Sequence, residues 1–127
     1  MKHPMSDVIA LRQLPWQSAD GASVMIEARF GLPTPLPGSG DGEAVDWYCP
    51  YEVERVRESA EDGGGTCEML VQHATLGADS VQALYHALQI VGVEISTLAG
   101  SPATYWADVP NFGFPLVPKK RKKKKQQ

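Results

Sequence analysis

Six carboxylates between residues 52 and 68 are the side chains of this sequence whose spacing most suggests a binding surface. They are Glu52, Glu54, Glu58, Glu61, Asp62 and Glu68. The first two alternate on the outer face of a predicted strand, the last lies on the next predicted strand, and the other three occupy the connection between the strands. An acidic surface steers a basic partner and raises its association rate, although many such surfaces only keep a protein in solution. We therefore expect a partner-binding acidic face, with a basic protein as the partner.

Cys49 and His73 are the one pair of residues that resembles a catalytic arrangement, because a cysteine nucleophile needs a base within hydrogen-bond reach. Both positions fall on the apolar face of their predicted strands, and no acid is placed to orient the histidine. We expect a buried thiol against a core histidine. The glycine run at 63–65 lacks the lysine and the following helix of a P-loop, and no dinucleotide fingerprint is present. The sequence therefore predicts no catalytic residues and a protein that is not an enzyme.

Metal binding has no better support in the sequence. His3, His73 and His86 fall on three different predicted elements, and no cysteine or histidine spacing matches a zinc motif. The acidic residues between 41 and 46 do not follow the pattern of a calcium-binding loop. We expect neither a metal nor another cofactor.

A polybasic block lies close to the C-terminal end of the sequence. It consists of Lys119, Lys120, Arg121, Lys122, Lys123, Lys124 and Lys125. The preceding 118 residues hold five basic and all fifteen acidic residues, a net charge of −10 that the overall value of −3 conceals. A like-charge block is expected to be disordered and to bind nucleic acid or another anionic surface in a salt-dependent manner. Screening of the acidic body and the absence of any specific role are the alternatives. We divide the chain into one domain at 1–118 and a tail at 119–127.

Alternation of apolar and polar side chains predicts the strands that carry these residues. We place them at 7–16, 23–32, 46–57 and 66–75. An Asp-Gly turn joins the first two strands, and the last two form a hairpin centred near residues 61–62. That register places Cys49 opposite His73 and Cys67 opposite Arg55. The two thiols are then too far apart for a disulfide, and we expect both to be buried and free.

One helix is predicted, over residues 79–98. Its apolar stripe repeats at steps of three and four and consists of Val81, Leu84, Leu88, Val91, Ile95 and Leu98. Asp79 is the expected N-cap, with Gln82 completing a pair that resembles a capping box. After the helix we expect a short strand at 104–107 and a closing loop at 111–115, whose aromatic residues pack back on the body.

Consecutive strands followed by a helix favour an α+β fold, with an antiparallel four-stranded meander sheet and the helix packed on one face. A chain of 127 residues with 43% hydrophobic content suits one globular domain. No apolar run reaches the ~20 residues that cross a bilayer, and none resembles a signal peptide. We therefore expect a cytoplasmic protein without a transmembrane segment. It is a monomer, or a dimer formed through the exposed first strand.

Three short segments stand out as a set. They are Asp46-Trp47-Tyr48-Cys49-Pro50-Tyr51, then Gly77-Ala78-Asp79-Ser80-Val81-Gln82-Ala83-Leu84 with Ala87-Leu88-Gln89, and Gly113-Phe114-Pro115. With them, the sequence resembles a family of small uncharacterised bacterial proteins, a domain of unknown function. The resemblance spans about residues 20–117 and leaves out the tail. It implies a bacterial, stand-alone single domain, and it brings no catalytic residues with it.

Three functions are compatible with these features. The first is a non-catalytic partner-binding protein, in its specific form an immunity-type protein that neutralises a basic toxin through the acidic face. The second is a nucleic-acid-associated accessory protein that acts through the polybasic tail. The third, an enzyme or small-molecule binder with a cleft between the helix end and residues 33–37, has the weakest support.

Overall fold

A computed structural model describes residues 5, 7–36, 46–57 and 65–118. Its strands are β1 (Val8–Gln17), β2 (Ser23–Gly31), β3 (Thr34–Pro35), β4 (Trp47–Arg57), β5 (Thr66–Gly77) and β6 (Ser101–Pro102). The helix α1 spans Ser80–Ser96, and two 3₁₀ helices follow it, η1 at Thr104–Asp108 and η2 at Pro110–Gly113. No helix within the described ranges is long and apolar enough to cross a membrane.

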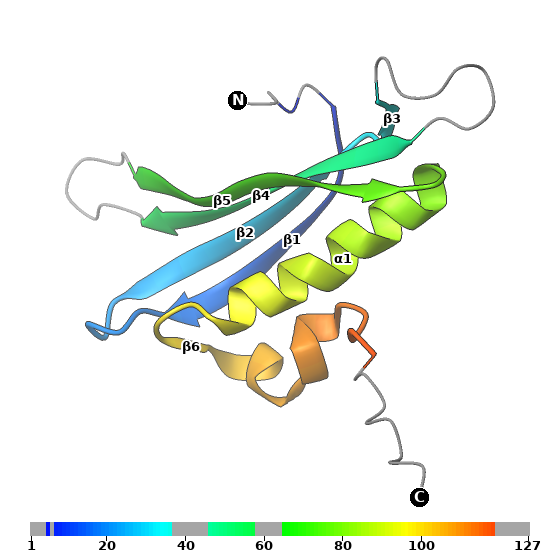
Figure 1. The fold of residues 1–127 in the computed structure, drawn as a ribbon. Coiled ribbons are helices and arrows are strands. Elements are labelled where there is room, and N and C mark those ends of the chain that lie inside the picture. Colours follow the sequence, from blue (N-terminus) through cyan, green and yellow to red (C-terminus); the bar gives the residue numbers. More distant parts are fainter. Residues whose placement is uncertain (1–4, 6, 37–45, 58–64, 119–127) are drawn as a thin grey trace, which may run out of the picture.

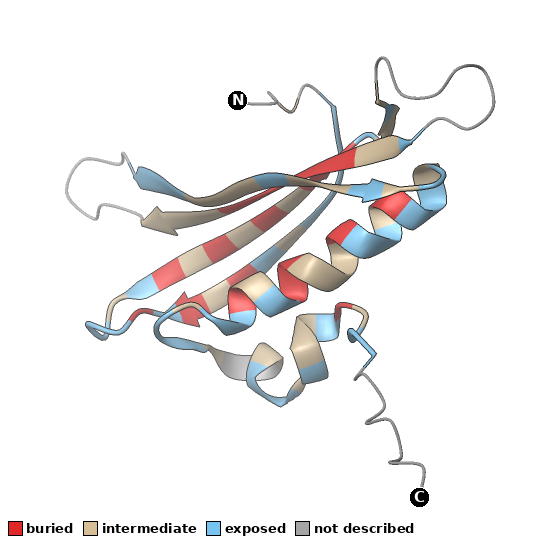
Figure 2. Cartoon of the chain, in the orientation of Figure 1, coloured by how far each residue is buried: buried red, intermediate tan, exposed pale blue. Residues whose placement is uncertain are grey.

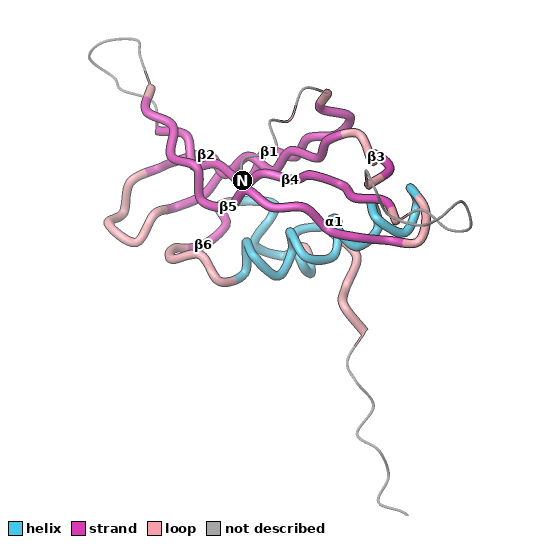
Figure 3. Tube along the Cα trace, turned by 45° about the horizontal axis from the view of Figure 1, so that its top comes forward, coloured by secondary structure: helices cyan, strands magenta, loops and turns pink. Residues whose placement is uncertain are grey.

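The strands form a single curled antiparallel sheet in the order β5-β4-β2-β1-β6, with α1 along one face (Figures 1 and 3). The α+β class and the antiparallel pairing of the four long strands are as predicted. The expected strand count of four was wrong, because two strands of two residues each extend the sheet. β3 adds to the end of β4 at the Thr34–Tyr48 pair, and β6 adds to the end of β1 at Trp16–Pro102.

The core lies between the sheet and α1, and strand alternation decides which side chains enter it. In Figure 2 buried and partly exposed residues alternate along β2, as the sequence pattern predicts. The buried cluster consists of Leu14, Trp16, Val24, Ile26, Ala28, Phe30, Cys49, Tyr51 and Val53 from the sheet, Ala83, Ala87, Val91 and Ile95 from α1, and Phe114. The second face of the sheet carries no described helix.

The helix begins as predicted, but the face that it buries is rotated relative to the expected apolar stripe. Asp79 Oδ1 accepts a hydrogen bond from the Gln82 amide at 2.7 Å, and Gln82 Oε1 accepts one from the Ala78 amide at 2.6 Å. Val81 was expected in the core and is 74% exposed, whereas Ala83 and Ala87 are fully buried. Alanine at these positions lets the helix backbone approach the sheet closely, and the larger Leu84 and Leu88 pack beside the contact line, partly buried.

The predicted register of the β4–β5 hairpin was wrong by two residues at its far end. Cys49 pairs with Thr75 and Tyr51 with His73, so the expected Cys49–His73 pair does not form. A bulge between Val53 and Glu54 then shifts the remaining pairs. An apolar pattern with a period of two cannot distinguish registers that differ by two residues, because both match the same faces.

The C-terminal segment closes the core, as expected for residues 111–115. The Phe112 ring lies 5.8 Å from Trp16, and the Phe114 ring lies 5.9 Å from Phe30, both measured between ring centroids. The strand expected at 104–107 was wrong, because these residues belong to the 3₁₀ helix η1. Between the helix and Pro118, strand pairing is confined to β6, which is followed by η1.

Candidate functional site

A cluster of charged side chains lies on the sheet face opposite α1, with Arg29 at its centre. The Arg29 guanidinium lies 3.2 Å from a carboxylate oxygen of Glu52, 3.2 Å from one of Glu54 and 3.5 Å from one of Glu27. Gln72 Nε2 donates a 2.7 Å hydrogen bond to the second oxygen of Glu52. We call Glu27, Arg29, Glu52 and Glu54 the carboxylate cluster.

Strand register brings these four residues together. Arg29 on β2 pairs directly with Glu52 on β4, and Glu27 pairs with Glu54. Directly opposed residues share a face of the sheet, so all four side chains project away from the helix. Gln72 joins them from β5, where it pairs with Glu52. The cluster therefore spans β2 and β4, and Gln72 adjoins it from the edge strand β5.

The cluster is partly buried and keeps an excess of negative charge. The four side chains are 12–19% exposed, and one guanidinium faces three carboxylates. Burial on its own lowers the pKa of Arg29, yet hydrogen bonds with Glu54 and Glu52 raise that pKa above its ordinary value. Arg29 therefore stays charged, and the ionised cluster carries a net charge of −2.

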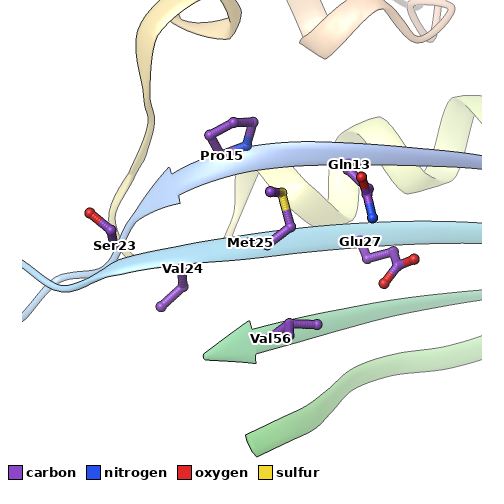
Figure 4. A pocket seen from close by; sticks show the side chains of 7 residues that line it. All are labelled: Gln13, Pro15, Ser23, Val24, Met25, Glu27 and Val56. Atoms are coloured by element: carbon purple, nitrogen blue, oxygen red, sulfur yellow. The ribbon is translucent and has the colours of Figure 1, made fainter. Parts of the chain in front are cut away.

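An open hollow of about 500 Å³ adjoins the cluster on the same part of the sheet (Figure 4). Its lining residues are Gln13, Pro15, Ser23, Val24, Met25, Glu27 and Val56, which come from β1, β2 and β4. Glu27 belongs to both the hollow and the cluster. A single docking group can therefore touch apolar side chains and a carboxylate at once.

The structure brings together only part of the predicted acidic face. Glu52 and Glu54 lie in the cluster, but Glu68 pairs with Arg55 at 3.3 Å. Arg55 lies opposite Ile26, a core residue, so the Arg55–Glu68 pair projects from the helix-side face of the sheet. The other three predicted carboxylates, Glu58, Glu61 and Asp62, lie outside the described residues, as does the basic tail at 119–125.

Sequence reasoning missed Glu27 and Arg29 as members of the site. Their alternation along β2 places them on the polar face of the strand. The missing information was the register between β2 and β4, which are not joined by a short turn; this register decides which carboxylates Arg29 meets.

Neither Cys49 nor Tyr51 is prepared for catalysis at neutral pH. Burial raises the pKa of the Cys49 thiol to about 11, and the thiol donates to the Gly31 carbonyl oxygen at 3.4 Å. Burial, with a smaller effect of the Glu94 charge, raises the pKa of Tyr51 to about 12. Both groups stay protonated and neutral, whereas a nucleophile or base needs its deprotonated form. Among the described residues, no three His, Cys, Asp or Glu side chains gather in a metal-binding arrangement.

The two cysteines should differ sharply in reactivity. Cys67 was expected to be buried and is exposed, whereas Cys49 is fully buried. We expect a thiol-specific reagent at pH 8 to label one thiol of the folded protein quickly, and Cys67→Ala to abolish that fast phase. Cys49 should react only after denaturation, because the thiolate is the reactive form and its pKa is about 11. Fast labelling of the Cys67→Ala protein would contradict the buried position of Cys49.

Comparison with known proteins places the chain in a family. No curated protein and no solved structure matches the sequence. A family described as a domain of unknown function, DUF6968, matches residues 10–116, which run from the third residue of β1 through η2 and include the Gly113-Phe114-Pro115 segment. The match covers most of the chain and ends before the basic tail. The chain therefore belongs to the DUF6968 family.

Proposed function

We propose that this chain is a non-catalytic protein-binding module whose sheet face opposite α1 docks a basic protein. The observation that carries the proposal is the carboxylate cluster, where three carboxylates face one guanidinium beside an apolar hollow. The excess of two negative charges is complementary to a partner that presents arginine or lysine at this position. The acidic first 118 residues add long-range attraction for the same partner.

The surroundings of the cluster suit a protein interface. Met25, Val56 and Pro15 supply apolar contact area in the hollow. Specific interfaces combine an apolar centre with charged groups that select the partner and its orientation. An arginine side chain of the partner is the group that fits best, because its stem can pack in the hollow while its guanidinium reaches Glu27 and Glu54.

The test starts with affinity capture by the full chain from a lysate of the native organism, followed by binding measurements with the purified partner. Replacing Glu27 and Glu54 by glutamine leaves the Arg29–Glu52 pair in place and removes the excess charge. We expect this double variant to bind the partner at least about tenfold more weakly at low salt.

The matched control replaces Asp20 and Asp108 by asparagine, which changes the net charge by the same amount at exposed positions away from the cluster. It should change the affinity by less than about twofold, because distant surface charges are screened. Equal loss in both variants would show that only net charge matters. Failure to capture any basic protein would contradict the proposal.

An immunity-type protein is the specific form of this function that we propose. The captured partner would then be a basic toxin, and the chain would suppress its activity. Expression of the partner alone should arrest growth, and co-expression of the chain should restore it. Growth that is unaffected by the partner alone would exclude this form and leave protein binding as the function.

A second candidate function rests on the seven consecutive basic residues at 119–125. These residues favour a nucleic-acid-associated accessory protein. It predicts that the full chain retains RNA or DNA, that binding falls steeply with salt, and that a chain ending at Pro118 retains none. Equal capture of one basic protein by both chains would instead place the function on the folded domain.

A further inference from the structure

The first half of β1 has an open edge. On one side β1 pairs with β2 along its length, and on the other side β6 reaches it only at Trp16 and Gln17 among the described residues. The open part carries four consecutive exposed residues without charge, Val8, Ile9, Ala10 and Leu11. The three larger side chains are 46–51% exposed. An apolar strand with an open edge is a ready template for another strand.

A bulge gives this edge an unusual charge pattern. Val8 pairs with Gly31 and Ala10 with Phe30, so Ile9 is an extra residue in β1. Phe30 faces the helix and Gly31 faces away, so Ala10 and Val8 point to opposite faces although they are two residues apart. Strand alternation then places Asp7 on the helix side, together with Arg12, which pairs with the core residue Ala28. Without the bulge, residues five apart would point to opposite faces.

We propose that the open edge of β1 pairs antiparallel with the same edge of a second copy of this chain. A two-fold axis perpendicular to the sheet keeps each side chain on its own face, so only residues that share a face can oppose each other. The bulge allows Asp7 of one copy to oppose Arg12 of the other on the helix side. Val8 then opposes Leu11 on the other face, and Ile9 and Ala10 lie at the centre. The edge is thus self-complementary in both charge and apolar side chains.

Arg12 is held in position for this contact. Its guanidinium lies 5.2 Å from the Trp106 ring centroid and 4.8 Å from that of Phe114, and Nη1 donates to the Phe112 carbonyl oxygen at 2.8 Å. Five N–H donors leave others for a carboxylate of the partner. A preorganised guanidinium loses little side-chain entropy when Asp7 arrives.

The charge of the chain favours this contact over other self-contacts. The first 118 residues carry a net charge of −10, so most pairings of two copies bring like charges together. The stretch from Val8 to Leu11 is uncharged and is bounded by one acidic and one basic residue. The assembly also stops at two copies, because each copy uses its one β1 edge in the contact. This interface lies at the edge of the sheet, so it does not depend on the proposed function of the opposite face.

Analytical ultracentrifugation of the full chain tests the proposal. A short strand pair buries little surface, so we expect a monomer–dimer equilibrium with a dissociation constant on the order of 10–100 µM. Asp7→Lys, which sets two cations opposite each other, and Leu11→Lys should each weaken dimerisation at least tenfold. Val81→Lys is the matched control, because Val81 is a 74% exposed apolar residue on α1, and it should leave the equilibrium unchanged.

Disulfide trapping tests the register in the same samples. In a Cys67→Ala background, an oxidised mixture of Val8→Cys and Leu11→Cys chains should form a crosslinked heterodimer, because directly opposed residues are within disulfide reach. Each chain alone should crosslink far less. A monomer at about 0.5 mM would overturn the proposal, even if the edge bound an extended segment of another protein. The proposal would also be overturned by a dimer whose dissociation constant is unchanged by Asp7→Lys and Leu11→Lys and that yields no selective crosslink.

Discussion

Replacing Arg29 by alanine is expected to lower the free energy of unfolding by about 2–4 kcal/mol, slightly below the range for a fully buried ion pair. The substitution leaves Glu27, Glu52 and Glu54 close together without a cation, and all three are less than 20% exposed. Their mutual repulsion and the cost of keeping them partly desolvated both favour the unfolded chain. Urea denaturation followed by circular dichroism measures the change.

Two comparisons separate this effect from the general loss of an arginine. Arg57→Ala removes a pair with Asp20 in which the side chains are 39% and 62% exposed, and should cost less than about 1 kcal/mol. Adding Glu52→Gln and Glu54→Gln to Arg29→Ala should restore at least about 1 kcal/mol, because the repulsion is removed. A cost for Arg29→Ala no larger than that for Arg57→Ala would show that the cluster is solvated and makes little contribution to stability.

Replacing Gly77 by alanine is the second change with a large expected effect, about 2–3 kcal/mol of lost stability. A Cβ atom built at Gly77 would lie 2.3 Å from the Ala83 amide nitrogen and 2.8 Å from the Gln82 carbonyl carbon. Both are backbone atoms in the first turn of α1, so the helix would have to move away from β5. Thermal unfolding and the intensity of the helical circular dichroism signal measure the result.

Gly21→Ala provides the comparison for Gly77→Ala. Gly21 has a φ of +88° in the β1–β2 turn, and no atom lies within 4 Å of a Cβ built there. The substitution should therefore cost only the backbone strain, about 1 kcal/mol. A smaller loss for Gly77→Ala than for Gly21→Ala would contradict the close contact between β5 and the start of α1.

The sequence was sufficient for the fold class and for the faces of β2 and β4, but not for β5, where the bulge places Cys67 and Met69 on the face opposite α1. Alternation along β2 and β4 correctly separated core side chains such as Ile26 and Val53 from the outer polar ones. The helix start was predictable as well, because Asp79 and Gln82 form local hydrogen bonds that the residue types dictate. These features depend on residues that are close in sequence.

Features that depend on long-range register were not predictable. The prediction of a Cys49–His73 pair was wrong because registers that differ by two residues bury the same faces of the strands. Glu68 lies outside the predicted acidic face because the bulge at Val53–Glu54 changes which residue it opposes. The carboxylate cluster needed the register between β2 and β4, which are separated by residues 32–46, and no local signal specifies that register.

The most direct test of the central claim is to map the footprint of the captured basic partner by amide hydrogen exchange of the full chain. We predict slower exchange on binding in β2 and β4 around Met25–Arg29 and Glu52–Val56, and little change in α1. The Glu27→Gln, Glu54→Gln double variant should lose this protection at the same partner concentration. Protection confined to α1, or binding that leaves exchange in β2 and β4 unchanged, would contradict the claim that this sheet face is the docking surface.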